Sequence, residues 1–579
     1  MFDKTKKKIA LAAIPFTLAG IVLAGCTATG VAASDSSTGT TSASAASTSG
    51  VDAALTAEEV LAENADATTV TADEADSSTE TTVTLNGETA TIDGTGASAD
   101  GSTVTITAGG TYRLSGSLTG SVVVEAPDDA VVTILLDGAE ITNAAGAALS
   151  VITADDVALV LQDGTENALS DADSYADDAE VNAALYSDAD LTISGEGSLT
   201  VQGNGNDGIT STDDLKILSG TITVTAADDG LRGKDSLTVE GGTVAVTAGG
   251  DGFTSDQTDD ATQGYLWISA GEITVESAGD AFAAATDLVI TGGDISATSG
   301  GGATAELSAD ASAKALKGGV YVIVAGGTIQ ADAADDALHS DGAVHISEGD
   351  VSVSTGDDGI HAEVALLIDG GTTTVTESTE GIESSAITIA GGTVDVTASD
   401  DGLNASSGSG ESMQDSGETI TISGGTTTIN AEGDGFDSNG SASMSAGTLT
   451  IWGPTRDGNG AIDVNGTFDV TGGTLLAAGS AGMAATPSTD SAQGWVFATA
   501  SGQVGSTVQI LSGGEVVAEY TADKAFATVV YSGEGITSGS DYEVVVDGTS
   551  TTVTAGEGGS TGMGPGQGGG QGGGEMPGR

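Results

Sequence analysis

Apolar and polar residues alternate over short runs along most of this chain, and glycine pairs separate the runs. In one stretch Leu237 and Val239 alternate with polar residues, a Gly-Gly pair follows, and Val244 and Val246 alternate again. A period of two is typical of a β-strand that buries one face. A glycine pair permits the positive φ that a tight corner needs. The pattern therefore predicts two or three short strands in every 22 residues or so.

A short phrase marks each of these units: an acidic residue, then Gly or Ala, then an apolar residue, before the strands begin. It starts at Asp207, Asp229, Asp251, Asp280, Asp336, Asp358, Glu380, Asp401 and Asp434. The steps are 22, 22, 29, 56, 22, 22, 21 and 33 residues, and the longest step spans a degenerate copy that we place at Gly301-Gly302. A fixed period of this size indicates a stacked repeat, and a propeller blade would need about 40–45 residues. We therefore predict an all-β, single-stranded parallel β-helix with coils of about 22 residues.

The same patterns divide the chain. We expect a signal peptide at 1–25, a flexible tether at 26–80 with a short helix near 55–65, and irregular first coils at 81–206. The regular array occupies 207–490, a small β cap or domain follows at 491–555, and the Gly-rich residues 556–579 form a disordered tail. The residues added in the three long steps all fall between the phrase and the next strand, which predicts a working face along one edge of the stack.

The N-terminal residues predict export. Four lysines precede an apolar run over 9–25, a length typical of a secretory signal, and Leu23-Ala24-Gly25-Cys26 resembles a bacterial lipobox. We expect Cys26 to be lipidated and to hold the protein at the outer face of the cell membrane. The alternative is an uncleaved anchor that happens to be followed by a cysteine. Because Cys26 is the only cysteine, no intrachain disulfide can form.

The net charge of the chain limits the kinds of partner that it can bind. The 579 residues carry a formal net charge of −71, which argues against nucleic acid as a partner, because phosphate binding requires patches of Lys and Arg. Because the acids repeat once per coil, we expect them to form a line along the stack, with repulsion of about 3 kcal/mol per neighbouring pair near a protein surface. Ca²⁺, which takes six to eight oxygen ligands, would offset it. The candidate ligands are Asp207, Asp228, Asp229, Asp251, Asp280, Asp335, Asp336, Asp357, Asp358, Asp400, Asp401 and Asp434. The alternative is that Asp-Gly makes a good turn and its charge is solvated.

Few other residues suggest chemistry. Arg232 and Lys234 lie beside Asp229, where they could bind substrate or simply neutralise neighbouring acids. His339 and His361 occupy comparable positions one coil apart, so with His345 they could cluster, or they could be exposed beside their turns. Trp267 and Trp452 could stack on a sugar or belong to the core. No catalytic residue can be picked out by spacing, because paired carboxylates are too abundant.

The phrase order resembles a known family over roughly residues 105–555. The resemblance is carried by residues 108–116, 165–167, 190–201, 208–215 and 230–235. The family consists of bacterial surface carbohydrate-binding proteins that are right-handed parallel β-helices, similar in fold to pectate lyases. They bind Ca²⁺ and plant-type polysaccharides, including polygalacturonate, without established lyase activity. The resemblance implies Ca²⁺ ligands among the acids at the coil corners and no catalytic residue.

Three functions follow as hypotheses. The first is a lipid-anchored surface protein that binds an acidic polysaccharide through Ca²⁺ without cleaving it. The second is a polysaccharide lyase, which needs a base beside Ca²⁺, and Arg232, Lys234 and Arg456 are the candidates. The third is an adhesive or spacer protein with a protein partner.

Overall fold

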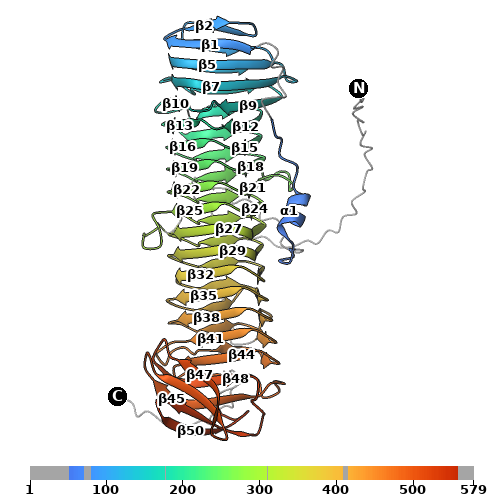
Figure 1. Ribbon diagram of the computed structural model, residues 1–579, viewed down its shortest axis with the longest axis vertical. Coiled ribbons are helices and arrows are strands. Elements are labelled where there is room, and N and C mark those ends of the chain that lie inside the picture. The colour runs from blue at the N-terminus through green and yellow to red at the C-terminus, as the bar shows by residue number, and fades with distance from the viewer. Residues whose placement is uncertain (1–50, 71–79, 177, 309–310, 408–414, 559–579) are drawn as a thin grey trace, which may run out of the picture. The chain divides into compact units, whose positions relative to one another are not determined.

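The computed structural model describes residues 51–70, 80–176, 178–308, 311–407 and 415–558. Within them the chain is almost entirely β, with one helix (Figure 1). The signal peptide, Cys26 and most of the Gly-rich tail lie outside the described residues. Successive copies of the phrase pair in parallel and in register, since Leu231 lies opposite Phe253 and Phe253 opposite Phe282. The predicted parallel stack of coils is confirmed, and its right-handed sense stays a prediction.

Each regular coil contributes one strand to a 16-stranded sheet, which we call the short-strand sheet. Many of its strands have only three residues and follow the phrase directly. Its members are β3 (Ala97–Asp100), β4 (Thr103–Ile106), β6 (Ser121–Glu125), β8 (Leu149–Thr153), β11 (Ala183–Ser187), β14 (Asp207–Ser211), β17 (Leu231–Gly233), β20 (Phe253–Ser255), β23 (Phe282–Ala284), β26 (Leu316–Gly318), β28 (Leu338–Ser340), β30 (Ile360–Ala362), β33 (Ile382–Ser384), β36 (Leu403–Ala405), β39 (Phe436–Ser438) and β42 (Asp463–Val464).

The second and third strands of the coils form two further parallel series. The second series comprises β9 (Asp156–Leu161), β12 (Asp190–Gly195), β15 (Asp214–Ile217), β18 (Ser236–Val239), β21 (Tyr265–Ile268), β24 (Asp287–Ile290), β31 (Ala365–Ile368), β34 (Ala386–Ile389), β37 (Thr419–Ile422), β40 (Ser441–Met444) and β43 (Phe468–Val470). The third comprises β10 (Glu166–Ser170), β13 (Ser198–Gly203), β16 (Thr221–Ala226), β19 (Thr243–Ala248), β22 (Glu272–Ser277), β25 (Asp294–Ser299), β32 (Thr372–Glu377), β35 (Thr393–Ala398), β38 (Thr426–Ala431), β41 (Thr448–Trp452) and β44 (Thr474–Gly479). Long strands that serve both series join them into one 30-stranded sheet, namely β7 (Val131–Thr142), β27 (Tyr321–Ala333) and β29 (Ala343–Thr355).

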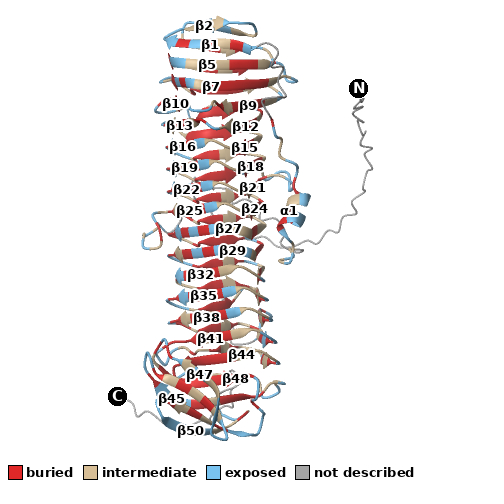
Figure 2. Cartoon of the chain, viewed as in Figure 1, coloured by how far each residue is buried: buried red, intermediate tan, exposed pale blue. Residues whose placement is uncertain are grey.

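Aliphatic side chains from the three series fill the inside of the stack. Alternate residues of β16 and β19 are buried, and one continuous cluster runs from Val83 to Val530 (Figure 2). The Gly-Gly corners behave as predicted, because the second glycine has a positive φ, as in Gly242 at 91° and Gly371 at 67°. The glycine pairs that predicted the corners therefore form them, and the alternating residues that predicted the strands form those strands.

The two ends of the stack are closed by antiparallel strands. At the N-terminal end, β1 (Glu80–Gly87) pairs with β2 (Ala90–Asp93) and with β5 (Gly110–Thr119), and β3 pairs antiparallel with β4. At the other end β48 (Phe526–Ser532) pairs antiparallel with β44 and with β45 (Trp495–Gly502). A four-stranded sheet follows, of β46 (Thr507–Ser512), β47 (Glu515–Thr521), β49 (Asp541–Val546) and β50 (Thr549–Thr554). Trp452 is 3% exposed in the core beneath it, so it is not available to a sugar.

Residues 52–70, which we call the strap, lie along the outer surface of the second series and differ from the flexible tether predicted over 26–80. Their helix α1 (Ala57–Glu63) is the predicted short helix, and it begins at Thr56, whose side chain forms a capping box with Glu59. Ala57 and Val60 pack on Val289 and Ile323, with Trp267 at the edge of that cluster. Beyond α1 the strap is held by hydrogen bonds from Lys216 Nζ to Thr69 Oγ1 (2.6 Å) and from the Val70 N–H to Thr192 Oγ1 (2.9 Å). Apolar burial and hydrogen bonds with side chains of the stack hold this part of the predicted tether in place.

Candidate functional site

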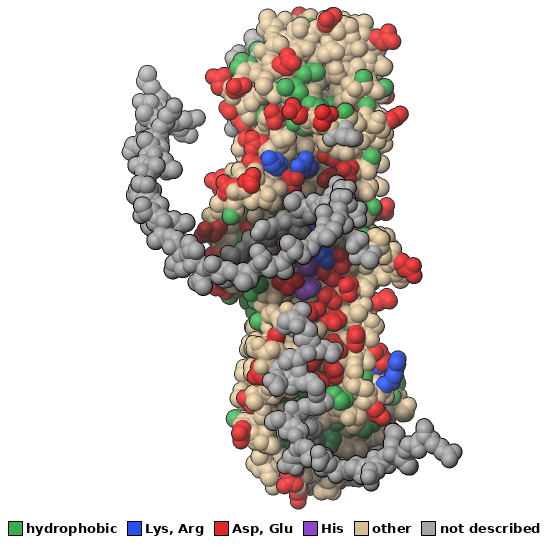
Figure 3. Space-filling model, turned by 180° about the vertical axis from the view of Figure 1, so that it is seen from behind, with side chains coloured by type: hydrophobic (Ala, Val, Ile, Leu, Met, Phe, Trp, Pro, Cys, Tyr) green, Lys and Arg blue, Asp and Glu red, His purple; other side chains and the backbone are tan. Residues whose placement is uncertain are grey.

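The acidic phrases form a single line at the start of the short strands, as predicted. The Gly230 N–H donates to the Asp251 carbonyl (2.9 Å), and the Gly252 N–H donates to the Asp280 carbonyl (2.9 Å), so the phrases are themselves hydrogen-bonded from coil to coil. We call the first residue of each phrase the acid column. It consists of Asp207, Asp229, Asp251, Asp280, Lys314, Asp336, Asp358, Glu380, Asp401, Asp434 and Gly460. Acidic side chains follow this face of the stack (Figure 3).

The degenerate copy lies elsewhere than predicted. The coil between Asp280 and Asp336 carries its phrase at Lys314-Ala315-Leu316, not at Gly301-Gly302, because Leu316 pairs with Phe282 and Leu338. The inserted residues 300–313 therefore precede the phrase, whereas the other two insertions follow it as predicted. The prediction of a single inserted edge is wrong for this coil. The 22-residue step from Lys314 to Asp336 and the shared Ala-Leu pair were the available signal.

The Asp-Gly pair has a structural reason that differs from turn formation. A Cβ on Gly230 would lie 2.6 Å from the Gly252 carbonyl oxygen, so the phrase needs a very small residue there because adjacent coils approach closely. The aspartate accepts a hydrogen bond from the next coil: Asp229 Oδ1 from the Asp251 N–H (2.8 Å), and Asp251 Oδ1 from the Asp280 N–H (2.7 Å). One oxygen of each such carboxylate is thus used by the backbone, and the other remains for side chains.

The acidic doublets combine two kinds of carboxylate. The first members are the more accessible, because Asp228, Asp357 and Asp400 are exposed and Asp335 is half-buried. The second members belong to the acid column and are more enclosed. Among them Asp336 is 3% exposed and Asp358 is 7% exposed, while Asp229 and Asp401 are half-buried. Only the first members therefore fit the prediction of acids solvated beside a turn.

A second line of side chains, which we call the outward column, stands three residues after the acid column. Strand pairing places its members opposite one another on successive coils, as with His339 and His361 or Asp437 and Asp463. It consists of Thr210, Arg232, Thr254, Ala283, Lys317, His339, His361, Glu383, Asn404, Asp437 and Asp463. Some of its members donate to the acid column: Thr210 Oγ1 donates to Asp207 Oδ2 (2.9 Å) and Asn404 Nδ2 to Glu380 Oε2 (2.6 Å). Sequence reasoning missed most of this column, although a fixed offset from each phrase marks it.

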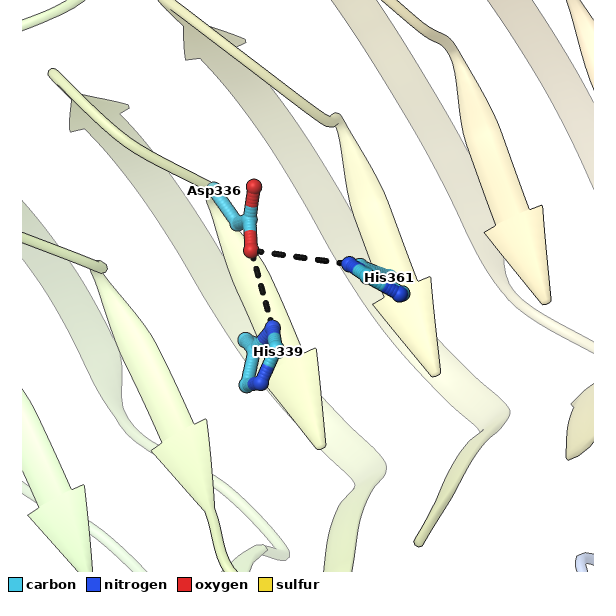
Figure 4. Close-up of side chains that lie close together, drawn as sticks. All are labelled: Asp336, His339 and His361. Carbon is cyan, nitrogen blue, oxygen red and sulfur yellow. Dashed lines mark hydrogen bonds and ion pairs between the residues drawn. The ribbon is translucent and has the colours of Figure 1, made fainter. Parts of the chain in front are cut away.

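In the middle of the stack, cations neutralise the acids. Asp336 Oδ2 lies 2.7 Å from Lys314 Nζ, 2.8 Å from His339 Nδ1 and 3.8 Å from His361 Nδ1 (Figure 4). Asp335 Oδ2 also contacts Lys314 Nζ (2.9 Å), and Asp280 Oδ2 contacts Lys317 Nζ (2.9 Å). We call these coils, from Asp280 to His361, the cation-bearing segment. His339 and His361 therefore form the cluster that was one of the two predicted alternatives, and His345 lies apart, with Nδ1 2.8 Å from the Leu55 carbonyl oxygen.

The charged groups of the cation-bearing segment stabilise one another's ionised forms. Burial alone raises the pKa of Asp336, but the hydrogen bonds from His339 and His361 and the charge of Lys314 outweigh it and hold that pKa well below its usual range. Burial lowers the pKa of His361, but its contacts with Asp336 and Asp358 outweigh that effect and raise the pKa to about 10. The cluster is thus an ionised network with buried acid and enclosed cations.

The next coils lack such cations. From Glu380 to Asp463 neither column contains a lysine, arginine or histidine, and we call these coils the acid-only segment. Burial, and then the charges of Glu380 and Asp358, raise the pKa of Glu383 to about 8. Burial, and then the charges of Asp401 and Asp434, raise the pKa of Asp437 to about 8. Burial and the charge of Asp434 raise the pKa of Asp401 to about 7. These raised pKa values mean that full ionisation of the segment is unfavourable, so several of its carboxyl groups retain protons near neutral pH.

The predicted basic residues do not share a single site. Arg232 belongs to the outward column, and its Nη2 forms an ion pair of 2.6 Å with Asp256 in the insertion after β20. Lys234 lies in the turn after β17, where its N–H donates to the Ser211 carbonyl oxygen (3.0 Å). Arg456 is exposed between β41 and β42, outside both columns. The observed pairing of Arg232 corresponds to the neutralising role that was one of its two predicted interpretations.

Three groups in the described residues bring at least three ligand atoms within 4.8 Å of one another. The groups are Asp336 with His339 and His361, Asp358 with His361 and Glu383, and Asp335 with Asp336 and Asp357. Only the last is made of oxygens alone, and there Lys314 Nζ lies between two of the carboxylates. No helix within the described residues is long and apolar enough to cross a membrane.

Comparison with known proteins adds a family to this geometry. The family model of a carbohydrate-binding domain-containing protein matches residues 100–359 and 357–564. A protein of Acetivibrio thermocellus with the same description is 41% identical over 128 residues, which is 21% of this chain and 45% of that relative. A solved structure described as a polysaccharide lyase-like protein from C. thermocellum, a gadolinium derivative, is 30% identical. It covers 47% of this chain and 100% of its own, with a TM-score of 0.38.

Proposed function

The chain belongs to the family of carbohydrate-binding domain-containing proteins, and on that premise we propose that its short-strand sheet binds an acidic, pectin-like polysaccharide through Ca²⁺ without cleaving it. The observation that carries the proposal is the acid-only segment. Its carboxylates face outward on successive coils, their pKa values are raised, and neither of its columns supplies a basic partner.

The donor set of the acid-only segment fits Ca²⁺, which prefers carboxylate and carbonyl oxygens. Burial raises the pKa values of Asp401, Asp434 and Asp437, and nearby acids raise them further, as Asp434 does for Asp401 and as Asp401, Asp434 and Asp463 do for Asp437. Ca²⁺ bound there would take its remaining oxygens from water and from the sugar carboxylates. The triad of Asp335, Asp336 and Asp357 fits less well, because Lys314 already neutralises it.

Bound Ca²⁺ would also overcome the repulsion between this acidic protein and an acidic polysaccharide. A protein with a net charge of −71 repels a uronate polymer, and a bound divalent ion reverses the local sign. Coils repeat at about 4.8 Å, which is comparable to the length of one sugar unit, so an extended chain lying along the outward column could bridge successive ions. Affinity should then grow with polymer length through multivalency.

The test is retention on polygalacturonate in Ca²⁺ and in chelator. Asp437→Asn combined with Asp463→Asn should reduce Ca²⁺-dependent binding by about tenfold, because two outward carboxylates are lost. Asp395→Asn is the matched control, since Asp395 lies in an exposed position on β35, in the third series of the same region. Equal retention with and without chelator would contradict the Ca²⁺ model.

A lyase is the second candidate, and Lys317 and His361 favour it. Both are partly accessible members of the outward column, with side chains 37% and 22% exposed, so a base could reach a bound sugar. We expect no cleavage, because both are held as cations by buried carboxylates. A rise in ultraviolet absorbance from new double bonds during incubation with polygalacturonate would instead identify the protein as a lyase.

We propose, in addition, that the protein is exported and lipid-anchored at the cell surface through Cys26. Cys26→Ser should remove the protein from the membrane fraction or leave it unprocessed. Normal anchoring of that variant would refute the proposal.

A further inference from the structure

Two imidazoles and one carboxylate converge at the centre of the cation-bearing segment. His339 and His361 come from adjacent strands, β28 and β30, in which they are register partners, and their ring centroids lie 5.0 Å apart at 83°. The Nδ1 atoms of both rings face the same oxygen, Asp336 Oδ2 (Figure 4). The ligand atoms of the three residues lie within 4.8 Å of one another. Small side-chain shifts would bring all three into the first coordination sphere of one ion.

The donor chemistry differs from that of the acid columns. Imidazole nitrogen suits Zn²⁺, Cu²⁺ and Ni²⁺, whereas Ca²⁺ prefers oxygen. One of the two histidines, His339, has its other ring nitrogen held by an acceptor, as metal-binding histidines usually require. His339 Nε2 lies 3.1 Å from Asp341 Oδ1, and Asp336 Oδ1 accepts the Asp358 N–H at 3.2 Å. The Asp336 carboxylate and the His339 ring are therefore oriented by partners outside the set.

The site is also accessible to an incoming ion. The His361 side chain is 22% exposed, so the site opens to solvent on the outward column. Asp358 Oδ2 lies 3.3 Å from His361 Nδ1 and offers a further oxygen. Two competitors must be displaced: the protons on the imidazole nitrogens that face Asp336, and Lys314, whose Nζ occupies the same Asp336 oxygen at 2.7 Å but also contacts Asp335 Oδ2 at 2.9 Å. An incoming cation would leave that ammonium with a carboxylate of its own.

We propose that Asp336, His339 and His361 bind one late first-row divalent metal ion, such as Zn²⁺, and that Lys314 weakens this binding by competing for Asp336. The site is separate from the Ca²⁺ sites proposed above in its residues and in its donor type. It would place a metal ion on the face that the polysaccharide occupies.

The experiment is titration of the metal-free full chain with Co²⁺ and then Zn²⁺ in millimolar Ca²⁺, followed by visible absorption and calorimetry. We expect one Co²⁺ per chain with imidazole and oxygen ligands, displaced by one Zn²⁺. His339→Ala and His361→Ala should each weaken binding about tenfold or more. His345→Gln is the matched control, because His345 binds the strap and lies outside the cluster. Lys314→Met should tighten binding, an effect that loss of a merely structural contact would not produce.

Several results would overturn the proposal. They are Zn²⁺ affinity unchanged in the double histidine variant, no Zn²⁺ binding by either the wild type or Lys314→Met, and a Co²⁺–thiolate band that assigns the ion to Cys26. Circular dichroism on each variant identifies any loss of fold. Polygalacturonate retention in the same variants separates the two proposals, because the Ca²⁺ response should survive the loss of both histidines.

Discussion

The cation-bearing and acid-only segments have the same architecture and opposite electrostatics. In most of their coils, both place an acid at the first position of the phrase and a polar side chain three residues later. In the first, Asp336 contacts Lys314 and His339, and its pKa lies well below the usual range. In the second, Asp437 faces other carboxylates, and its pKa is raised to about 8. The difference arises from side chains at equivalent positions and not from the backbone.

This contrast indicates how a stack can carry one acid per coil. Like charges about 5 Å apart repel by about 3 kcal/mol at an effective dielectric constant of 20. Hydrogen bonds from the backbone of the next coil offset part of this repulsion, as between the Asp434 N–H and Asp401 Oδ1 (2.5 Å). Where lysine and histidine complete the neutralisation, the fold needs nothing else. Where they are missing, the remaining charge is available to an external cation.

The largest expected effect is from Asp336→Asn. It keeps an oxygen for the Asp358 N–H but removes the charge that holds Lys314, His339 and His361, so we expect a loss of about 3–5 kcal/mol of unfolding free energy. Asp401→Asn is the matched change in the acid-only segment. There the lost charge is an unfavourable one, so in chelator at pH 8 that variant should be no less stable than wild type. Denaturant unfolding measures the stability of both variants. Equal losses of unfolding free energy would mean that the two segments do not differ in their electrostatics.

Lys314→Met should convert one segment into the other. It leaves Asp335, Asp336 and Asp357 as an oxygen triad without its ammonium, at an expected cost of about 1.5–3 kcal/mol in chelator. Millimolar Ca²⁺ should restore part of the loss by mass action. The measurement is the melting temperature in chelator and in Ca²⁺. A variant that loses stability equally in both would mean that the triad cannot accept Ca²⁺.

The acid-only segment should make stability fall as pH rises. Asp401, Asp437 and Glu383 have folded pKa values of about 7, 8 and 8, above the ordinary values of about 4, so the folded chain binds more protons than the unfolded chain between these limits. In chelator the melting temperature should therefore drop by several degrees between about pH 5 and pH 8. Ca²⁺ should flatten this dependence. A rise in stability with pH over that range would show that the pKa values are not raised.

The smallest effect is expected from Lys317→Ala. Its ion pair with Asp280 is partly exposed, since the lysine side chain is 37% accessible, so we expect about 0.2–1 kcal/mol. Unfolding in low and high salt measures it, and salt should reduce the difference from wild type. A loss as large as that of Lys314→Met would mean that enclosure of the cation is not what distinguishes the two lysines.

Much of the fold was predictable because its cause is local. Alternating residues such as Leu237 and Val239 define strands, and a glycine such as Gly242 defines a corner, without reference to distant parts of the chain. The line of acids followed from the period alone. The docking of the strap was missed because it depends on Val289 and Ile323, more than 200 residues away, and no local pattern identifies such contacts.

The site was less accessible to sequence reasoning. The Lys314 phrase was misplaced because it has a base at the position where the predicted phrases have an acid. The outward column needs the register of the short strands, which three-residue segments such as Ile360–Ala362 hardly specify by themselves. Whether His339 and His361 meet or point apart depends on that register. The geometry of neighbouring coils, and not composition, decides it.

The strap gives the molecule a defined response to load. Its contacts with the stack follow one another along the strap (Figure 1). Tyr321 Oη and His345 Nδ1 contact its beginning, beside α1, and Thr192 Oγ1 contacts its end at Val70. A pull on the chain before Val51 would reach them one at a time, so the strap should peel at low force and not shear as a unit. Release of about 19 residues at about 3.4 Å each would free a segment with a contour length of roughly 65 Å before any force reaches β1. The strap would then detach at low force before the stack bears any load. A force–extension trace pulled from Val51 that lacks an early low-force step of up to that length would rule out this early detachment.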